Sequence, residues 1–161
     1  MFLYRIKQFY WAVTSKITSE DITFINSYLD KNEKNIFNKL SSYEQKHSIN
    51  VAKDVMQIYK GNENLIKAAL LHDIGKIYKR LNPIEKSLIV ILNKISKGKL
   101  KKFSNFKKID IYYNHAEKGY NLLKSYKKYD EKFLYLIKNH HNDKITGNKE
   151  LDILKKCDSM N

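Results

Sequence analysis

The residues of this chain best suited to chemistry are its histidines and two of its aspartates. The histidines are His47, His72, His115, His140 and His141. Asp73 follows His72 directly, and Asp158 lies near the end of the chain. Neutral imidazoles together with carboxylates suit Fe, Mn, Co, Ni or Zn, whereas carboxylates alone would suit Mg or Ca. The set therefore predicts a divalent metal site to which every histidine is a candidate contributor.

These candidate ligands outnumber the three or four protein ligands that one metal usually takes. Two ions that share a bridging carboxylate would use them economically. Such a pair activates a water for attack on phosphorus and stabilises the charge that builds on the phosphoryl oxygens. The sequence contains neither a Gly-x-Ser-x-Gly motif nor a P-loop that would indicate a different route.

The order His, His-Asp, His, His, Asp resembles the pattern of the HD superfamily of metal-dependent phosphohydrolases. The string His72-Asp73-Ile74-Gly75-Lys76 is similar to the HDIG form of the motif, which is seen in bacterial signalling-nucleotide phosphodiesterases. The resemblance runs from about Ser41 to Asp158 and implies a bacterial protein. It implies an all-α helical bundle, with an HD domain at 41–161 and an N-terminal helical extension at 1–40 packed on it.

The resemblance also implies roles for single residues. It places His47, His72, Asp73 and Asp158 on a first metal, and the bridging Asp73 with His115, His140 and the further candidate His141 on a second. Lys76 is the candidate contact for a substrate phosphate, although a lysine there also suits a helix C-terminus. Only three residues follow Asp158, where family members usually continue into another helix, so Asp152 is the alternative acid.

The function that the resemblance implies is hydrolysis of a phosphate ester or anhydride of a small phosphorylated molecule, with a nucleotide favoured. The HD-GYP subfamily has an acidic residue and a Gly-Tyr-Pro segment after the position of His140-His141-Asn142-Asp143, and neither occurs here. Cyclic di-GMP hydrolysis of that type is therefore not favoured. The alternative is a non-catalytic, metal-binding HD module that binds RNA or a protein partner through its lysine-rich surface.

The composition limits the classes of protein to which this chain can belong. A chain of 161 residues with 42% apolar residues and net charge +14 is long enough for one folded domain. The lysines are dispersed and only Arg5 and Arg80 are arginines, so a solvated lysine surface is favoured over a nucleic-acid site. Cys157 is the single cysteine, no signal peptide is recognised, and the longest apolar run, Leu88 to Leu92, is too short to span a bilayer. These features predict a cytoplasmic protein without a transmembrane segment.

The elements that must position the ligands are expected to be helices, because one proline and five glycines interrupt the chain and apolar and polar residues do not alternate for long. The expected helices cover about 2–13, 18–29, 36–40, 41–60, 62–73, 82–95, 109–125, 130–140 and 149–158, with a mobile loop at 97–108. Capping boxes at Thr18 and Ser41 begin two of them. The helix at 2–13 is expected to pack on the core, with a membrane surface as the alternative.

The His-Asp pair is expected at the end of a helix. Adjacent residues of a regular helix diverge by about 100°, so a helix end that loosens at Gly75 can direct both His72 and Asp73 toward one centre. Cys157 is expected to be a small buried apolar residue beside the metals.

Overall fold

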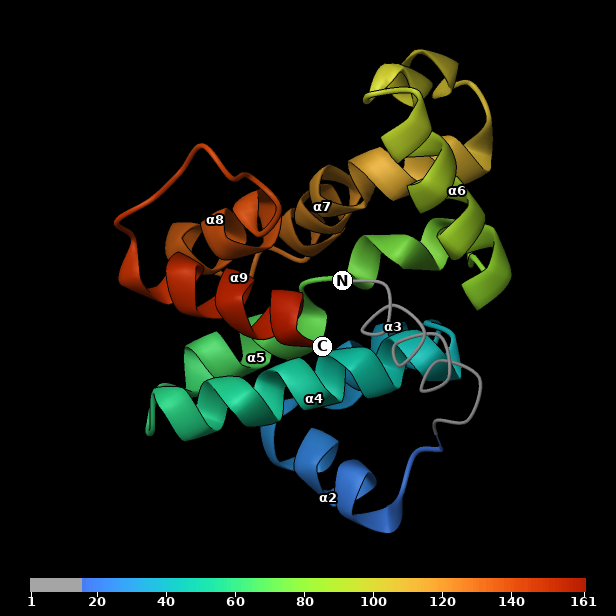
Figure 1. The fold of residues 1–161 in the computed structure, drawn as a ribbon. Coiled ribbons are helices and arrows are strands. Elements are labelled where there is room, and N and C mark those ends of the chain that lie inside the picture. The colour runs from blue at the N-terminus through green and yellow to red at the C-terminus, as the bar shows by residue number, and fades with distance from the viewer. Residues whose placement is uncertain (1–15) are drawn as a thin grey trace.

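The computed structural model describes residues 16–161, which form an all-α protein with no strand in that range (Figure 1). The helices are α2 (Ser19–Tyr28), α3 (Lys31–Phe37), α4 (Ser42–Ile58), α5 (Glu63–Leu71), the 3₁₀ helix η1 (Ile74–Tyr78), α6 (Pro83–Ile95), the 3₁₀ helix η2 (Lys99–Phe103), α7 (Lys107–Ser125), α8 (Glu131–Asn139) and α9 (Lys149–Met160). The helix predicted at 2–13 lies outside the described residues.

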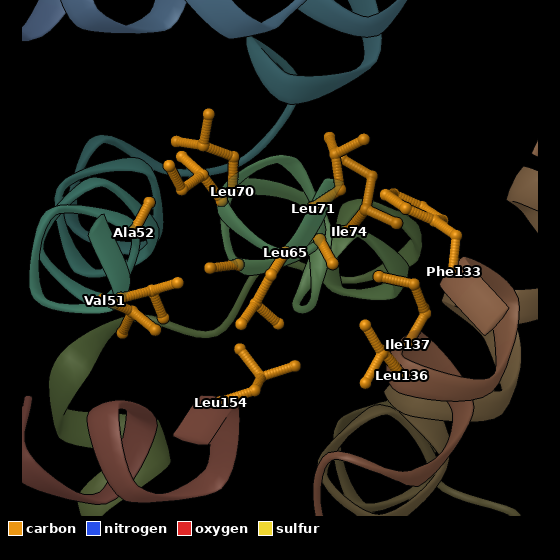
Figure 2. Close-up of a cluster of buried hydrophobic side chains, with 14 of the residues drawn as sticks. Val51, Ala52, Leu65, Leu70, Leu71, Ile74, Phe133, Leu136, Ile137 and Leu154 are labelled. Atoms are coloured by element: carbon orange, nitrogen blue, oxygen red, sulfur yellow. The ribbon is translucent and has the colours of Figure 1, made fainter. Parts of the chain in front are cut away.

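Helix α5 is at the centre of the main hydrophobic core. Six of its nine residues are fully buried: Leu65, Ile66, Ala68, Ala69, Leu70 and Leu71. A helix that is apolar around most of its circumference must be covered on several sides. Helices α4, α8 and α9 cover it, and Figure 2 shows Val51, Ile137 and Leu154 directed toward it from these three helices. The C-terminal end of α5, where His72 lies, is thereby placed deep inside the protein.

The capping boxes begin the helices where the sequence predicts. The Thr18 side chain accepts a hydrogen bond from the backbone N–H of Asp21, and the Asp21 side chain accepts one from the backbone N–H of Thr18. The Asp21 carboxylate is fully buried, at 2.5 Å from Lys46 Nζ and 2.8 Å from Lys53 Nζ, both on α4. This ion-pair cluster joins α2 to α4, and Phe37 of α3 is buried in the main core.

Helices α6 and η2 lie at one end of the molecule, where α7 connects them to the remainder (Figure 1). Their small apolar cluster is separate from the main core and consists of Leu81, Ile89 and Ile111. The prediction of a loop throughout 97–108 is wrong, because η2 forms after Gly98, whose φ of +82° suits glycine. Among residues 16–161, none of the helices combines the length and the apolar character that a membrane crossing requires.

Helix η1 crosses α7 at two glycines. A Cβ atom built on Gly75 would lie 1.9 Å from the backbone oxygen of His115 and 2.7 Å from the backbone nitrogen of Gly119. No side chain larger than hydrogen fits between these two backbones. The close approach brings His115 of α7 next to the segment that carries Asp73.

Candidate metal centre

The predicted ligands come from separate helices that meet around the C-terminal end of α5. His47 is on α4, His72 and Asp73 end α5, His115 is on α7, His140 and His141 end α8, and Asp158 is on α9. Both His72 and His140 are the residues that directly follow the last helical residue, so the prediction that the His-Asp pair lies at a helix end is confirmed.

Asp73 is at the centre of the cluster. Its Oδ2 atom is 3.4 Å from His72 Nε2 and 3.7 Å from His47 Nε2. Its Oδ1 atom is 3.2 Å from His115 Nε2 and 3.8 Å from His140 Nε2. Each oxygen of one carboxylate thus faces a different pair of imidazoles, which is the arrangement that a carboxylate bridging two cations requires.

Asp158 adds a second carboxylate on one side of the cluster. Its Oδ1 atom is 3.0 Å from His47 Nε2 and 3.5 Å from His72 Nε2. Its Oδ2 atom is 3.7 Å from Nδ1 of His141, whose side chain is half exposed. Asp152 instead accepts a hydrogen bond from the backbone N–H of Gly147 near the start of α9.

The three most buried imidazoles present the same nitrogen to the centre of the cluster. Their Nδ1 atoms bond to backbone oxygens one turn earlier in the same segment: Ala69 for His72 (2.7 Å), Ile111 for His115 (3.0 Å) and Ile137 for His140 (2.7 Å). A carbonyl oxygen only accepts, so each Nδ1 must carry the proton. In the neutral ring Nε2 then holds a lone pair, which is the form in which histidine binds a metal.

Four polar atoms of the cluster are buried without a hydrogen-bond partner, namely Nε2 of His72, His115 and His140, and Oδ1 of Asp73. Leaving a buried polar group unsatisfied costs about 1–3 kcal/mol. Here the Nε2 lone pairs of the neutral imidazoles face the oxygens of the Asp73 carboxylate. Nitrogen and oxygen lone pairs repel each other, because no proton lies between them to form a hydrogen bond. Divalent cations beside the two oxygens of Asp73 would give these atoms partners, and the residues present therefore fit a metal.

Two groups of donors are compact enough to hold an ion, because the donor atoms within each lie within 4.8 Å of one another. One group is His47, His72 and Asp73, and the other is Asp73, His115, His140 and His141. Asp73 is common to both.

The charge states of two of these groups suit metal binding. Burial lowers the pKa of His115 to about 4, so its ring is neutral at pH 7. Burial acts to raise the pKa of Asp73, but opposing influences, of which the positive charge of Lys76 is the largest, hold that pKa well below its ordinary value. The cluster thus offers a neutral imidazole and an ionised carboxylate at neutral pH.

Comparison with protein-family models gives one match, to the HD domain, over residues 45–160. The chain belongs to the HD-domain family. The match includes all seven candidate ligands of the cluster. Comparisons with curated proteins and with solved structures give no match.

Lys76 of this HD domain lies directly beside the cluster. Its ammonium group donates to Asp73 Oδ2, and its side chain is 13% exposed. Burial acts to lower the pKa of Lys76, but the negative charges of Asp73 and Glu44 raise it above its ordinary value. Lys76 therefore stays protonated, and it also lines the adjoining cavity.

The cavity beside the HD-domain cluster has a volume of about 990 Å³. Four candidate ligands line it, namely His47, His115, His141 and Asp158. Tyr43, Tyr112 and Tyr113 form part of its wall, and Lys86, which donates to the Tyr43 hydroxyl at 3.0 Å, adds a positive charge. A molecule in the cavity can thus contact four candidate metal ligands, aromatic rings and two ammonium groups.

Glu44, which completes the capping box of Ser41, also belongs to the site. It is 3% exposed, lines the cavity, and interacts electrostatically with Lys76 and Asp73. Burial raises the pKa of Glu44 above its ordinary value. Its spacing of three residues before His47 on one helix was the available signal, because residues at i and i+3 share a face.

The prediction that Cys157 is buried is confirmed. Its side chain is fully buried in the main core, and burial raises the pKa of the thiol to about 11. A neutral thiol in apolar surroundings contributes packing rather than reactivity.

Proposed function

We propose that this HD-domain protein is a metal-dependent phosphohydrolase that acts on a small phosphorylated molecule, with a nucleotide as the favoured class. The observation that carries the proposal is the set of four unpartnered atoms around Asp73, because a cluster of lone pairs without a cation is unfavourable by itself. When bound, two divalent ions would supply Lewis acidity and lower the pKa of a coordinated water.

The roles of the residues follow from their positions. Asp73 would bridge the ions, because its two oxygens face different imidazole pairs. His47, His72 and Asp158 would complete one site, and His115, His140 and His141 the other. Ala69 and Ile137 would keep their histidines in the metal-binding tautomer through the Nδ1 hydrogen bonds.

Lys76 would bind a phosphoryl oxygen of the substrate. Its ammonium group is charged, contacts the bridging carboxylate and lines the cavity. A lysine provides a compact positive charge suited to phosphate. Lys76→Met is therefore expected to raise KM while the metal content stays near normal, whereas loss of a lysine that only positions Asp73 would lower the metal content and leave KM unchanged.

The cavity supports a substrate of nucleotide size. Its volume of about 990 Å³ is at the upper end of the range of roughly 300–1,000 Å³ for small-molecule sites. Tyr43 and Tyr112 line the cavity and offer rings against which a base can stack. Lys86 donates a hydrogen bond to the Tyr43 hydroxyl and adds a positive charge beside this ring. These features favour a base-bearing phosphate over inorganic polyphosphate.

The decisive experiment measures metal content and turnover in the same preparation. Protein purified without chelators is analysed for metals, loaded with Mn or Fe, and assayed with bis-p-nitrophenyl phosphate and a panel of nucleotides. We expect two metals per chain and turnover that Asp73→Asn abolishes. Protein that holds two metals but hydrolyses neither the phosphodiester nor any nucleotide would refute the proposal.

The alternative function, a metal-binding module that binds RNA or a protein, is supported by the net charge of +14. It predicts RNA binding that weakens steeply as salt rises, because lysine–phosphate contacts release counterions. Salt-sensitive RNA binding by a metal-loaded, inactive protein would favour this alternative.

A further inference from the structure

Helix α6 has an apolar face that no other part of the described chain covers. Ile84, Leu88, Ile91, Leu92 and Ile95 are between 42% and 74% exposed. At about 100° per residue, these five positions fall within an arc of about 100° on one side of the helix. The opposite side of α6 lines the cavity through Pro83, Lys86, Ser87 and Val90, and Ile91, at the edge of the exposed arc, also reaches the cavity. The exposed side chains are therefore a continuous apolar strip on an otherwise anchored helix.

The segment after α6 carries further exposed residues, which are aromatic and basic. Phe103 is 55% and Phe106 is 65% exposed, and η2, which ends at Phe103, packs on α6. Five exposed lysines lie between Ile95 and Lys108: Lys97, Lys99, Lys101, Lys102 and Lys107. We call the exposed apolar residues of α6, the two phenylalanines and these lysines the α6–η2 surface.

The charge of this region is strongly one-sided. Positions 79–108 contain ten lysine or arginine residues and one acidic residue, Glu85. This stretch therefore carries nine of the fourteen net positive charges of the chain. Glu85 is itself paired with Lys108 at 2.6 Å. An occupant of this surface must therefore be negatively charged and must also accept aliphatic side chains.

We propose that the α6–η2 surface binds an anionic lipid membrane. A helix that carries an apolar face beside lysines, without the length to span a bilayer, is suited to lie in the interface with its apolar side chains among the acyl chains and its lysines at the headgroups. Helix α6, with 13 residues, would lie along the surface over about 20 Å.

Two other occupants fit the surface less well. A second copy of this chain would bring two sets of lysines together, and like charges that face each other across an interface oppose association. RNA would match the charge, but recognition of single strands uses aromatic stacking and arginine, whereas five of the seven exposed apolar residues here are aliphatic.

The test is flotation of the full-length protein with vesicles of phosphatidylcholine alone or mixed with phosphatidylglycerol. Lys101→Gln/Lys102→Gln/Lys107→Gln is expected to lower partitioning into the anionic vesicles on the order of 100-fold, because each lysine near such a surface contributes about fivefold. Lys60→Gln/Lys132→Gln/Lys144→Gln removes the same charge from exposed positions elsewhere and is expected to bind much more strongly than the first variant.

The apolar contribution has its own matched pair. Leu88→Ser/Ile95→Ser is expected to lower partitioning on the order of tenfold, because two apolar side chains no longer leave water. Ile22→Ser/Ile58→Ser changes two similarly exposed residues on α2 and α4 and is expected to bind as the unchanged protein does.

Four results would overturn the proposal: no binding to anionic vesicles, equal binding to both vesicle types, unchanged binding by both α6–η2 variants, or a dimer in solution that Leu88→Ser/Ile95→Ser dissociates. Unchanged binding by those variants would place the lipid contact elsewhere in the chain, and the dimer would mean that a second copy covers this surface.

Discussion

Replacing Gly75 by alanine tests whether the crossing of η1 and α7 builds the metal centre. The new Cβ would lie 1.9 Å from the backbone oxygen of His115, whereas ordinary contacts begin at about 3.4 Å. Because the opposing atoms are backbone, the two helices must separate by about 1.5 Å. His115 Nε2, now 3.2 Å from Asp73 Oδ1, would move with α7.

The consequence for metal binding is large, because ligand distances in metal sites are reproduced to about 0.2 Å. We expect Gly75→Ala to lose the ion that His115 and His140 are proposed to hold, and therefore one of the two proposed metals per chain. Overpacking also costs about 1–3 kcal/mol. For a domain of this size, each 1 kcal/mol lowers the unfolding temperature by about 2–4 °C.

The comparison variant is Gly119→Ala, at the same crossing. Its Cβ would lie 3.2 Å from the backbone nitrogen of Gly75 and 3.3 Å from Cγ2 of Ile74, so shifts of a few tenths of an ångström suffice. Alanine is also favoured over glycine within a helix by about 1 kcal/mol. We expect near-normal stability and metal content for this variant.

Metal analysis after gel filtration and thermal unfolding in a chelator measure the two effects separately. The reasoning is refuted if Gly75→Ala retains two metals and unfolds within about 1 °C of the unchanged protein.

Three further predictions concern other positions. Asp73→Ala is expected to lose both metals, because both donor groups share this residue, and retention of two metals per chain would exclude the bridging role. His140→Ala is expected to lose more metal affinity than His141→Ala, because His140 is buried and its tautomer is fixed, whereas the His141 side chain is 50% exposed; the reverse order of metal dissociation constants would exchange their roles. Burial acts to raise the pKa of Asp21, but Lys46 and Lys53 lower it below its ordinary value, so stability from this group is present above about pH 4 and is lost as the pH falls further. Asp21→Asn is therefore expected to lower the free energy of unfolding, measured in urea, by about 1–3 kcal/mol at pH 7 and by less at pH 3. An equal decrease at both pH values would contradict this prediction.

Helix starts could be predicted from the sequence because their causes are local. Thr18 and Ser41 each cap a helix through atoms only a few residues away, and both caps form as expected. The 3₁₀ helix η2 was missed because its lysine-rich sequence has no apolar periodicity, and its position depends on packing against α6 and α7.

The candidate site was accessible to sequence analysis to the extent that its residue types are distinctive. Histidine is rare in this chain, so the order of five histidines carried the information. The role of Gly75 in the crossing of η1 and α7 could not be predicted, because it depends on a backbone that lies forty residues away in the sequence. The cavity was likewise not predicted, because its walls come from residues 43 to 161.

The hydrogen bonds at Nδ1 of His72, His115 and His140 have a consequence for protein engineering. Each acceptor is only three or four residues before its histidine. The backbone carbonyl that fixes the tautomer of the ring is therefore part of the same short peptide as the histidine. A designer who transplants this centre into another bundle would need to graft three single turns and reproduce their relative placement. No separate outer layer of supporting side chains would have to be invented for these three rings.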